Sequence, residues 1–319
     1  MRTTRRALAA LATAPIIAPA YAQWPERPVR IIVPFAPGGG TDIIARLVAQ
    51  HLQSVTGQTF LVENRSGGSG VIGTEAVFRA APDGLTLAMT SSGPFSILPL
   101  LQSVPYDPLT GFAHVALPAH TPLFMVVPPQ SPIRSIAEFI AAARANRAGM
   151  NACNVGVASP SHLAAEMFAA GFGLRFENIP HRGSAPALQD TVAGQCDVLF
   201  DSGTSSAIPV RQGQVRALGV TSPQRLPTFP DIPTIAESGK PGFQASTWSA
   251  LVAPAGTPAA IVERINAETR NFVRTAAQQE RLTAQGSVPL DLSPQGFTDF
   301  LRTEMDAWRD VIRTANIRV

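Results

Sequence analysis

The chain has 319 residues, of which 45% are hydrophobic and 15% charged, a balance that allows a large buried core divided between two lobes. Three of its 25 basic residues and none of its 22 acidic residues lie in the first 22 positions, so the remainder carries equal numbers of each charge. With no basic excess and no basic run interleaved with aromatic residues, the sequence excludes nucleic acid as a partner.

The first 22 residues have the pattern of a secretory signal peptide. A basic start is followed by a short apolar stretch and by the sequence Ala-Tyr-Ala at positions 20–22. We therefore expect cleavage after Ala22 and a periplasmic mature protein. The pair Arg5-Arg6 leaves Sec and twin-arginine export both open. Prolines interrupt the apolar stretch, which is too short for a membrane anchor.

The segment VRIIVPFAPGGGTDIIARLV, residues 29–48, predicts a strand, a glycine loop and a helix. The β-branched run at its start is typical of a buried strand, and apolar residues recur with helical spacing at its end. Gly38–Gly40 allow a close backbone approach, and Thr41 or Asp42 can cap the helix. Free N–H groups at a helix start favour an anion, and a tight turn without a ligand explains the local pattern equally well.

The same alternation recurs along the chain. It appears in TFLVENRSGGSGVIGTEAVFRAAPDGLTLAMTSS, in GMNACNVGVASPSHLAAEMFAAGFGL and in RFENIPHRGSAPALQDTVAGQCDVLFD. Alternating strands and helices predict an α/β fold with parallel sheets. The units form two sets, each with two strand-loop-helix units and a third strand. Ligands of such sheets bind at the carboxyl ends of the strands, so the loops of the two sets would face one cleft.

Two segments are interpreted as crossings between the sets. They are TPLFMVVPPQSPIRSIAEFI and ASTWSALVAPAGTPAAIVERINAETRNF, the second of which starts a helix at Thr257-Pro258. The C-terminal segment is helical, with Phe297, Leu301 and Trp308 on one face, and we expect it to pack on the first lobe. The expected division is a signal peptide at 1–22, a first lobe at 23–125 plus 247–319, and a second lobe at 126–246.

The loops of the second set carry polar side chains. Ser159 is a good N-cap, and its hydroxyl could serve the helix or a ligand. In HRGSAPALQD, Gly183 permits a turn and Ser184 can cap the helix that follows, while Arg182 could meet a carboxylate or remain a solvated charge. Asp201 closes the strand CDVLFD, where it would lie at the cleft mouth or pin a loop.

The motifs of common enzyme classes do not occur. The sequence has no G-x-S-x-G elbow, and its first glycine loop matches neither a phosphate-binding loop nor G-x-G-x-x-G. The five histidines show no metal-ligand spacing. A nucleophilic set of Ser161, His162 and Asp201 has suitable residue types, but adjacent residues on one helix turn point in different directions. The sequence therefore favours a binding protein, without metal or cofactor, over an enzyme.

Cys153 and Cys196 are the only cysteines. We place them at the starts of the first and third strands of the second lobe, which are neighbours in a doubly wound sheet. The spacing of neighbouring strands, about 4.8 Å, is close to the Cα separation that a disulfide needs. Both sulfurs would then lie at the edge away from the cleft. Two buried thiols are an equal alternative, because side chains of adjacent strands point perpendicular to the sheet.

Together these motifs resemble the Bug family, the periplasmic solute-binding proteins of tripartite tricarboxylate transporters. The similarity follows the family's order through nearly the whole mature chain. The matching pieces are WPERPVRIIVPFAPGGGTDIIARLVA, VENRSGGSGVIGTEAVFRAAPDGLTL, PYDPLTGF, SPSHLAAEMF, IPHRGSAPALQDTVAGQCDVLFD, GQVRALGVTSPQRLPTFPDIPTIAESG and LVAPAGTPAAIVERIN.

The resemblance implies a two-lobed, type II periplasmic-binding-protein fold of the Venus-flytrap kind. Each lobe is then a mainly parallel sheet flanked by helices, and two strands cross between the lobes. It implies a receptor that captures a small organic acid and delivers it to the permease subunits of a tripartite tricarboxylate transporter; we expect a monomer. The alternatives are an α/β hydrolase-like enzyme for a small carboxylate and a ligand-sensing partner of a membrane kinase.

In the family, main-chain N–H groups, hydroxyls and water grip the ligand. Two positions depart from its pattern: His181 stands where Tyr is common, and Phe95 and Ile97 stand in a segment that is commonly polar. We expect Phe95 and Ile97 to form an apolar wall that favours an acid with an aromatic or aliphatic body. The expected ligand-binding residues are Phe35, Gly38, Gly39, Gly40, Thr41, Asp42, Thr90, Ser92, Ser159, Ser161, His162, His181, Gly183, Ser184, Ala185 and Asp201.

Overall fold

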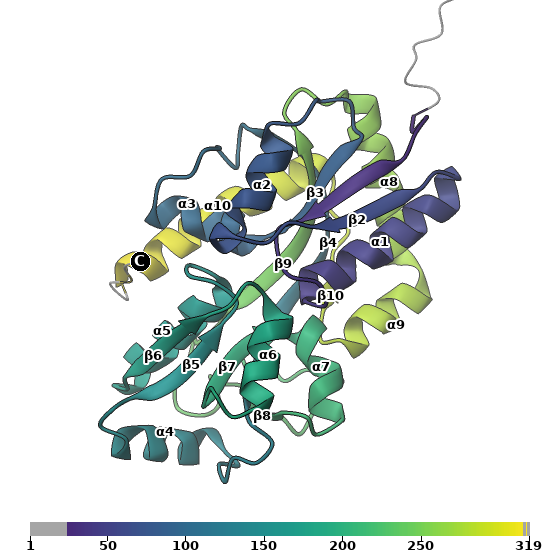
Figure 1. Ribbon diagram of the computed structural model, residues 1–319. Helices are drawn as coiled ribbons and strands as arrows, with labels where there is room; N and C mark the ends of the chain where they lie inside the picture. The colour runs from purple at the N-terminus through teal and green to yellow at the C-terminus, as the bar shows by residue number, and fades with distance from the viewer. Residues whose placement is uncertain (1–23, 315–316, 318–319) are drawn as a thin grey trace, which may run out of the picture.

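The structure is a computed structural model that describes residues 24–314 and 317 (Figure 1). The expected signal peptide at 1–22 and its cleavage site lie outside these residues. Within them, no helix is both long enough and apolar enough to cross a membrane.

The first strand group is built around the β-branched strand β1 (Val29–Val33). β1 lies between β2 (Phe60–Asn64) and β3 (Thr86–Ser91) and is parallel to both. The antiparallel strands β9 (Ser246–Pro254) and β4 (Phe112–Val127) complete the order β2-β1-β3-β9-β4, and β10 (Val288–Pro289) also pairs with β4. The helical elements of this half are α1 (Gly40–Thr56), η2 (Gly68–Gly70), α2 (Val71–Phe78), the π-helical turn η3 (Gly93–Ile97), α3 (Leu98–Leu101), α8 (Ala259–Arg274), α9 (Ala276–Ala284) and α10 (Pro294–Thr314).

The second strand group repeats this arrangement. β5 (Met150–Asn154) lies between β6 (Phe176–Pro180) and β7 (Val198–Ser202) and is parallel to both. β7 and β8 (Arg216–Val220) pair antiparallel with β4. The helices of this half are α4 (Ile136–Ala145), α5 (Pro160–Phe172), α6 (Ser184–Val192) and α7 (Gly203–Arg211).

The strands β4 and β9 connect the two halves. Residues 112–122 of β4 pair with β9, and residues 123–127 pair with β7 and β8, so one strand of 16 residues belongs to both groups. β9 returns the chain from the second half to the first (Figure 1). The expected α/β fold with two lobes and two crossing strands is thus confirmed.

Each half has its own apolar core. Ile31 of β1 is fully buried against α1 and α8, and an aromatic cluster that includes Phe168 and Phe200 fills the second half. Full burial of such a side chain contributes about 1.5–3 kcal/mol. On α10, Phe297 and Leu301 are buried with residues of β1, β3, β4 and β9. The C-terminal helix therefore packs on the first half, as the sequence predicts.

Cys153 and Cys196 form a disulfide, with their Cα atoms 5.7 Å apart. β5 and β7 are neighbours, as expected. The expected place of Cys153 at the start of its strand is wrong: β5 begins at Met150, directly after a turn at Gly149. Cys153 is consequently near the carboxyl end of β5, whereas Cys196 lies two residues before the start of β7, close to its expected place. The buried bridge packs with Ala187 of α6.

Candidate functional site

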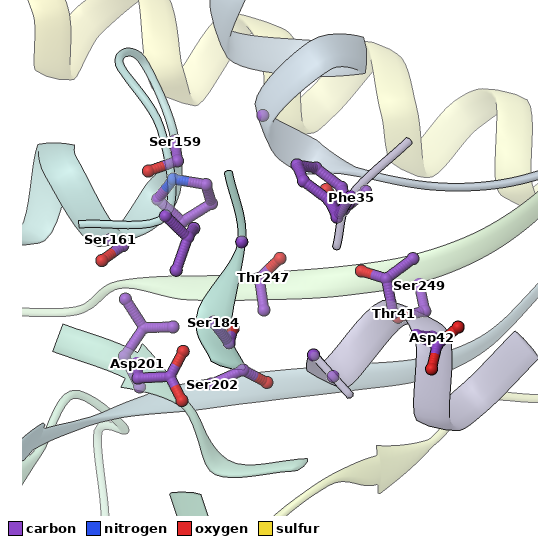
Figure 2. A pocket seen from close by; sticks show the side chains of 18 of the residues that line it. Phe35, Thr41, Asp42, Ser159, Ser161, Ser184, Asp201, Ser202, Thr247 and Ser249 are labelled. Atoms are coloured by element: carbon purple, nitrogen blue, oxygen red, sulfur yellow. The ribbon is translucent and has the colours of Figure 1, made fainter. Parts of the chain in front are cut away.

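A cavity of about 620 Å³, including its opening to solvent, lies between the two halves at the carboxyl ends of their parallel strands (Figure 2). Its lining combines helix starts with strand ends, and Asp42 and Asp201 are the charged members among the described residues. The lining residues are Phe35, Gly39, Gly40, Thr41, Asp42, Ser69, Ser91, Gly93, Leu123, Val155, Ser159, Pro160, Ser161, Gly183, Ser184, Asp201, Ser202, Thr247 and Ser249.

Asp42 fixes the glycine loop of the first half. α1 begins at Gly40 with Gly39 as N-cap and no side-chain cap, so the expectation that Thr41 or Asp42 caps the helix is wrong. Asp42 lies in the first turn and accepts a hydrogen bond from the backbone N–H of Gly38 at 2.9 Å. A residue in the first turn cannot also be the cap, but its carboxylate can reach back to an N–H that precedes the helix.

The other donors to Asp42 come from Arg46 and Asn64. The Arg46 guanidinium donates to both carboxylate oxygens, at 2.9 and 3.0 Å, and the Asn64 amide donates to Oδ1 at 2.9 Å. Burial raises the pKa of Asp42, but these donors and the Gly38 N–H outweigh burial and hold the pKa below its usual range. Asp42 is therefore ionised, and both of its oxygens are occupied by the protein.

The start of α5 supplies two hydroxyls. Ser159 is the N-cap, as predicted, and its Oγ accepts from the backbone N–H of His162 at 3.2 Å. Ser161 is 2% exposed, and its hydroxyl has no hydrogen-bond partner among the described residues. His162 turns away from the cavity: its Nδ1 accepts from the N–H of Ala158 at 3.3 Å, and burial lowers its pKa.

The start of α6 brings the two halves into contact. The helix begins at Ser184 with Gly183 as N-cap, so the expected cap at Ser184 is wrong. Gly183 has φ +143°, a conformation that only glycine adopts readily. The N–H of Ala36 in the first half donates to the carbonyl of Arg182 at 2.9 Å. The side chain of Arg182 is exposed, which agrees with its interpretation as a solvated charge.

Asp201, at the end of β7, is 1% exposed. Its Oδ2 accepts from Ser205 at 2.6 Å and from Ser206 at 2.7 Å, whereas its Oδ1 has no hydrogen-bond partner within the described part of the chain. Burial raises the pKa of this carboxyl, and the neighbouring hydroxyls of Ser184, Ser205 and Ser206 and the backbone N–H of Ser202 only partly offset the effect.

The arrangement suits a small polar ligand. The N-terminal ends of α1, α5, α6 and α7 reach the cavity through lining residues in or next to their first turns. Helix starts present free N–H groups and the positive end of the helix dipole, and serine hydroxyls add further donors. Since no Lys or Arg lines the described cavity, an anion here would be held by N–H and O–H groups alone. Among residues 24–314 and 317, no group of His, Cys, Asp and Glu could hold a metal ion.

Ten of the expected site residues line the cavity, and six do not. Thr90 does not line the cavity because successive strand residues alternate in direction, which places Ser91 there instead. Ser92 follows the end of β3, and its hydroxyl lies behind the cavity lining, 3.1 Å from that of Thr247. His181 contacts Asp190, 2.8 Å from its Nε2, and the Ile179 carbonyl. Those that do not line it are Gly38, Thr90, Ser92, His162, His181 and Ala185.

Sequence reasoning missed several lining residues. Thr247 and Ser249 lie at alternate positions of β9, a strand interpreted only as a crossing, and Ser69 belongs to the serine-glycine loop that was noted without a role. Ser202 directly follows Asp201, so the polar run at the end of β7 was the available signal. The missed residues are Ser69, Ser91, Gly93, Leu123, Val155, Pro160, Ser202, Thr247 and Ser249.

The expected apolar wall of Phe95 and Ile97 is wrong. Both side chains are fully buried in the core, where the Phe95 ring lies 5.0 Å from that of Phe112. The π-helical turn η3 directs Gly93, not Phe95, toward the cavity, where Gly93 approaches Ser159.

A family model described as tripartite tricarboxylate transporter family receptor matches residues 44–317. The protein encoded in the tcbD-tcbE intergenic region of Pseudomonas sp. strain P51 is 37% identical over 97% of this chain and 93% of its own length. BugT of Bordetella pertussis is 36% identical over 97% of this chain and 96% of its own length.

Solved structures show the same similarity. A protein of R. palustris solved with adipate has a TM-score of 0.90 and 34% identity, covering 92% of this chain and 99% of its own. MatC of Rhodopseudomonas palustris, solved with bound malate, has a TM-score of 0.86 and 32% identity, covering 91% of this chain and 100% of its own. The periplasmic binding protein BugD has a TM-score of 0.88 and 33% identity, covering 92% of this chain and 99% of its own.

Proposed function

The chain belongs to the tripartite tricarboxylate transporter receptor family of periplasmic solute-binding proteins, and we propose that it captures a small carboxylate between its lobes and delivers it to the permease of such a transporter. The observation that carries the proposal is the cavity itself, in which helix starts from both halves converge on one space lined by hydroxyls. Two solved relatives hold adipate and malate, which supports a small organic acid as the ligand class.

We propose distinct roles for the expected site residues. Ser161, Ser184 and Asp201 would contact the ligand directly, together with backbone N–H groups at the starts of α1, α5 and α6. Asp42 would act as a positioning residue, since its oxygens are occupied by Gly38, Arg46 and Asn64. The six residues that do not line the cavity would support the loops from behind.

The lobes would be residues 23–125 plus 247–319 and residues 126–246. β4 and β9, which pair across the junction, would act as the hinge. The backbone hydrogen bond from Ala36 to Arg182 supports a closed arrangement of the two halves. Small-angle scattering should then show a larger radius of gyration without ligand than with it; an equal radius at saturation would argue for a preformed pocket.

Membership of the family supports a proposal for where the protein acts and with which partners. The mature protein would act in the periplasm as a monomer, after cleavage of the segment 1–22, and would dock on the membrane subunits of the transporter. A ligand-sensing partner of a membrane kinase would bind the same acid without supporting its uptake. Uptake of labelled ligand by cells that contain and lack this protein distinguishes the two.

A ligand screen tests the proposal directly. Thermal-shift measurements with malate, succinate, adipate, citrate and benzoate, followed by calorimetry, should identify an acid that stabilises the protein. At about 100 times its dissociation constant, a ligand adds about 2.7 kcal/mol to the free energy of unfolding. The bound acid should be recovered unchanged. Chemical conversion of the acid, or the lack of any stabilising acid, would contradict the proposed function.

A further inference from the structure

One oxygen in the cavity is left without a partner by the fold. Asp201 lines the cavity at the end of β7 (Figure 2), and Ser205 and Ser206 both donate to its Oδ2. Its Oδ1 is buried without a hydrogen-bond partner in the described chain. Leaving a buried polar atom unpaired costs about 1–3 kcal/mol, so a ligand group that pairs with Oδ1 would be favoured.

The charges around Asp201 limit which ligand group can pair with its Oδ1. Within residues 24–314, the elements packed around it offer no free cation: β4 pairs Phe124 with Asp201, and α6 and α7 contribute serines. Among the titratable groups near the cavity, Asp42 is paired with Arg46, and the buried ring of His162 is neutral because its Nδ1 accepts a hydrogen bond. His181 is paired with Asp190.

An ionised Asp201 would therefore face an anionic ligand across the cavity without a counter-charge. Two carboxylates in such a place share a proton rather than both ionise. Burial raises the pKa of Asp201, which agrees with this arrangement.

We propose that Asp201 binds the ligand in its protonated form and donates a hydrogen bond from Oδ1 to a carboxylate oxygen of the ligand. This inference rests on the proposed function, because it requires an anionic ligand. The proton comes from solvent when the lobes close, so one proton is taken up for each acid bound. The site would then prefer acids without an ammonium group over amino acids, because a neutral Asp201 cannot compensate an ammonium.

The substitution Asp201→Asn mimics the protonated, neutral form of the Asp201 carboxyl. The amide oxygen can accept from Ser205 and Ser206, and the amide nitrogen can donate to the ligand. In the wild type, affinity should fall about tenfold per pH unit above the pKa of Asp201 in the free protein, because binding takes up one proton. The affinity of Asp201→Asn should change less than threefold between pH 6 and pH 9.

The experiment uses calorimetry from pH 6 to pH 9, where benzoate is ionised and the diacids malate, succinate and adipate are mostly or fully in their dianionic form. The tightest-binding of these acids is titrated in phosphate and in imidazole buffer, whose different protonation heats reveal proton uptake. We expect about one proton for the wild type and none for Asp201→Asn. Asp306→Asn is the control, since it alters an exposed carboxyl of α10 that does not line the cavity; proton uptake should remain about one.

A second readout is infrared spectroscopy. The difference spectrum between the wild type and Asp201→Asn at pH 7 should contain the carbonyl band of a protonated carboxyl when both proteins are saturated with acid. Without ligand, the band should appear only as pH falls below the pKa of Asp201. Absence of this band and of proton uptake, or a tenfold loss of affinity in Asp201→Asn at pH 6, would overturn the inference in favour of an ionised Asp201 that accepts from a ligand hydroxyl or ammonium. If no acid binds, the proposed function fails, and the infrared spectrum still decides the state of Asp201.

Discussion

Two buried aspartates line the cavity from opposite halves of the molecule, and their surroundings differ. Asp42, beside the glycine loop of the first half, receives hydrogen bonds from Gly38, Arg46 and Asn64 on both oxygens. Asp201, in the serine-rich second half, receives two on a single oxygen. The pKa of Asp42 is held low by its donors, in spite of burial, whereas burial raises the pKa of Asp201.

The difference separates a residue that shapes the site from one that is available to a ligand. In the first half, a polar cluster around Asp42 holds the glycine loop, and the loop offers only backbone to the cavity. In the second half, a disulfide ties β5 to the segment before β7, and Asp201 keeps one oxygen without a hydrogen-bond partner among the described residues. The same residue type at the same cavity therefore has two roles, decided by its donors.

We expect the largest effect from removing the disulfide that anchors the second half. Replacing both Cys153 and Cys196 by Ser should lower the free energy of unfolding by about 4 kcal/mol, the chain-entropy value for a loop of this length. The separation of 43 residues makes the loop long. Denaturant unfolding without reductant measures the change, and affinity for the acid should change less than threefold.

Mass spectrometry can test separately whether Cys153 and Cys196 are bonded in the purified protein. Intact mass after alkylation under denaturing, non-reducing conditions should show no added groups on the wild-type mature chain. Two added groups would mean that the second half has no covalent anchor, and the contrast between the halves would then rest on polar contacts alone.

We expect the next largest effect from replacing Asp42, which anchors the glycine loop of the first half. Asp42→Ala should lower the free energy of unfolding by about 2–3 kcal/mol, because the Gly38 N–H and Asn64 amide lose a charged acceptor. The value stays below that of a fully buried ion pair because the Arg46 side chain is 53% exposed. Asp306→Ala is the control: its pair with Arg309 is exposed on α10, and we expect a loss below about 0.5 kcal/mol. Equal losses would remove Asp42 from its proposed anchoring role.

A smaller effect concerns the contact between the halves. A Cβ at Gly40 would lie 3.0 Å from Ser202 Oγ and 3.2 Å from Thr204 Cβ, whereas one at Gly39 would lie 3.5 Å from Ser184 Cβ, an ordinary contact. Gly40→Ala should therefore hinder closure and weaken acid binding about tenfold, which is about 1.4 kcal/mol. Gly39→Ala, the adjacent control, should change affinity less than threefold. Similar calorimetric affinities for both variants would show that the glycine loop does not limit closure.

The order of strands and helices could be predicted from the sequence because it depends on local periodicity. The run at 29–33 and the helical pattern after it appear as β1 and α1, and the crossing strands appear as β4 and β9. Helix caps were harder to predict from the sequence. Gly39 and Gly183 are the N-caps, while the polar residues expected there, Asp42 and Ser184, lie within the first turns of α1 and α6. A cap is defined by backbone angles, which side-chain chemistry alone does not fix.

Site residues could be predicted where they lie in a recognisable glycine or serine loop. They could not be predicted where the register of a strand decides which side chains face the cavity. Ser91 replaces Thr90 at the cavity because a shift of one residue reverses the face of a strand. Thr247 reaches the cavity through the pairing of β9 with β3 and β4, far apart in sequence, and its hydroxyl lies 3.1 Å from that of Ser92. Phe95 was misplaced because a π-helical turn changes the direction of side chains that a sequence pattern treats as extended or helical.

The smallest effect is a difference in the pH dependence of the ligand-free protein. Because the folded-state pKa of Asp42 is lowered, its stabilising contribution is present above the unfolded value of about 3.9 and is lost as pH falls through the folded pKa. The pKa of Asp201 is raised, so its contribution is present below about 3.9 and is lost as pH rises through the folded pKa. Melting temperatures from pH 3 to pH 8 should therefore show the deficit of Asp42→Asn shrinking at the acid end, while Asp201→Asn gains on the wild type as pH rises. Parallel curves for the two variants would mean that both carboxyls titrate alike, and the distinction between an anchoring and a ligand-facing aspartate would fail.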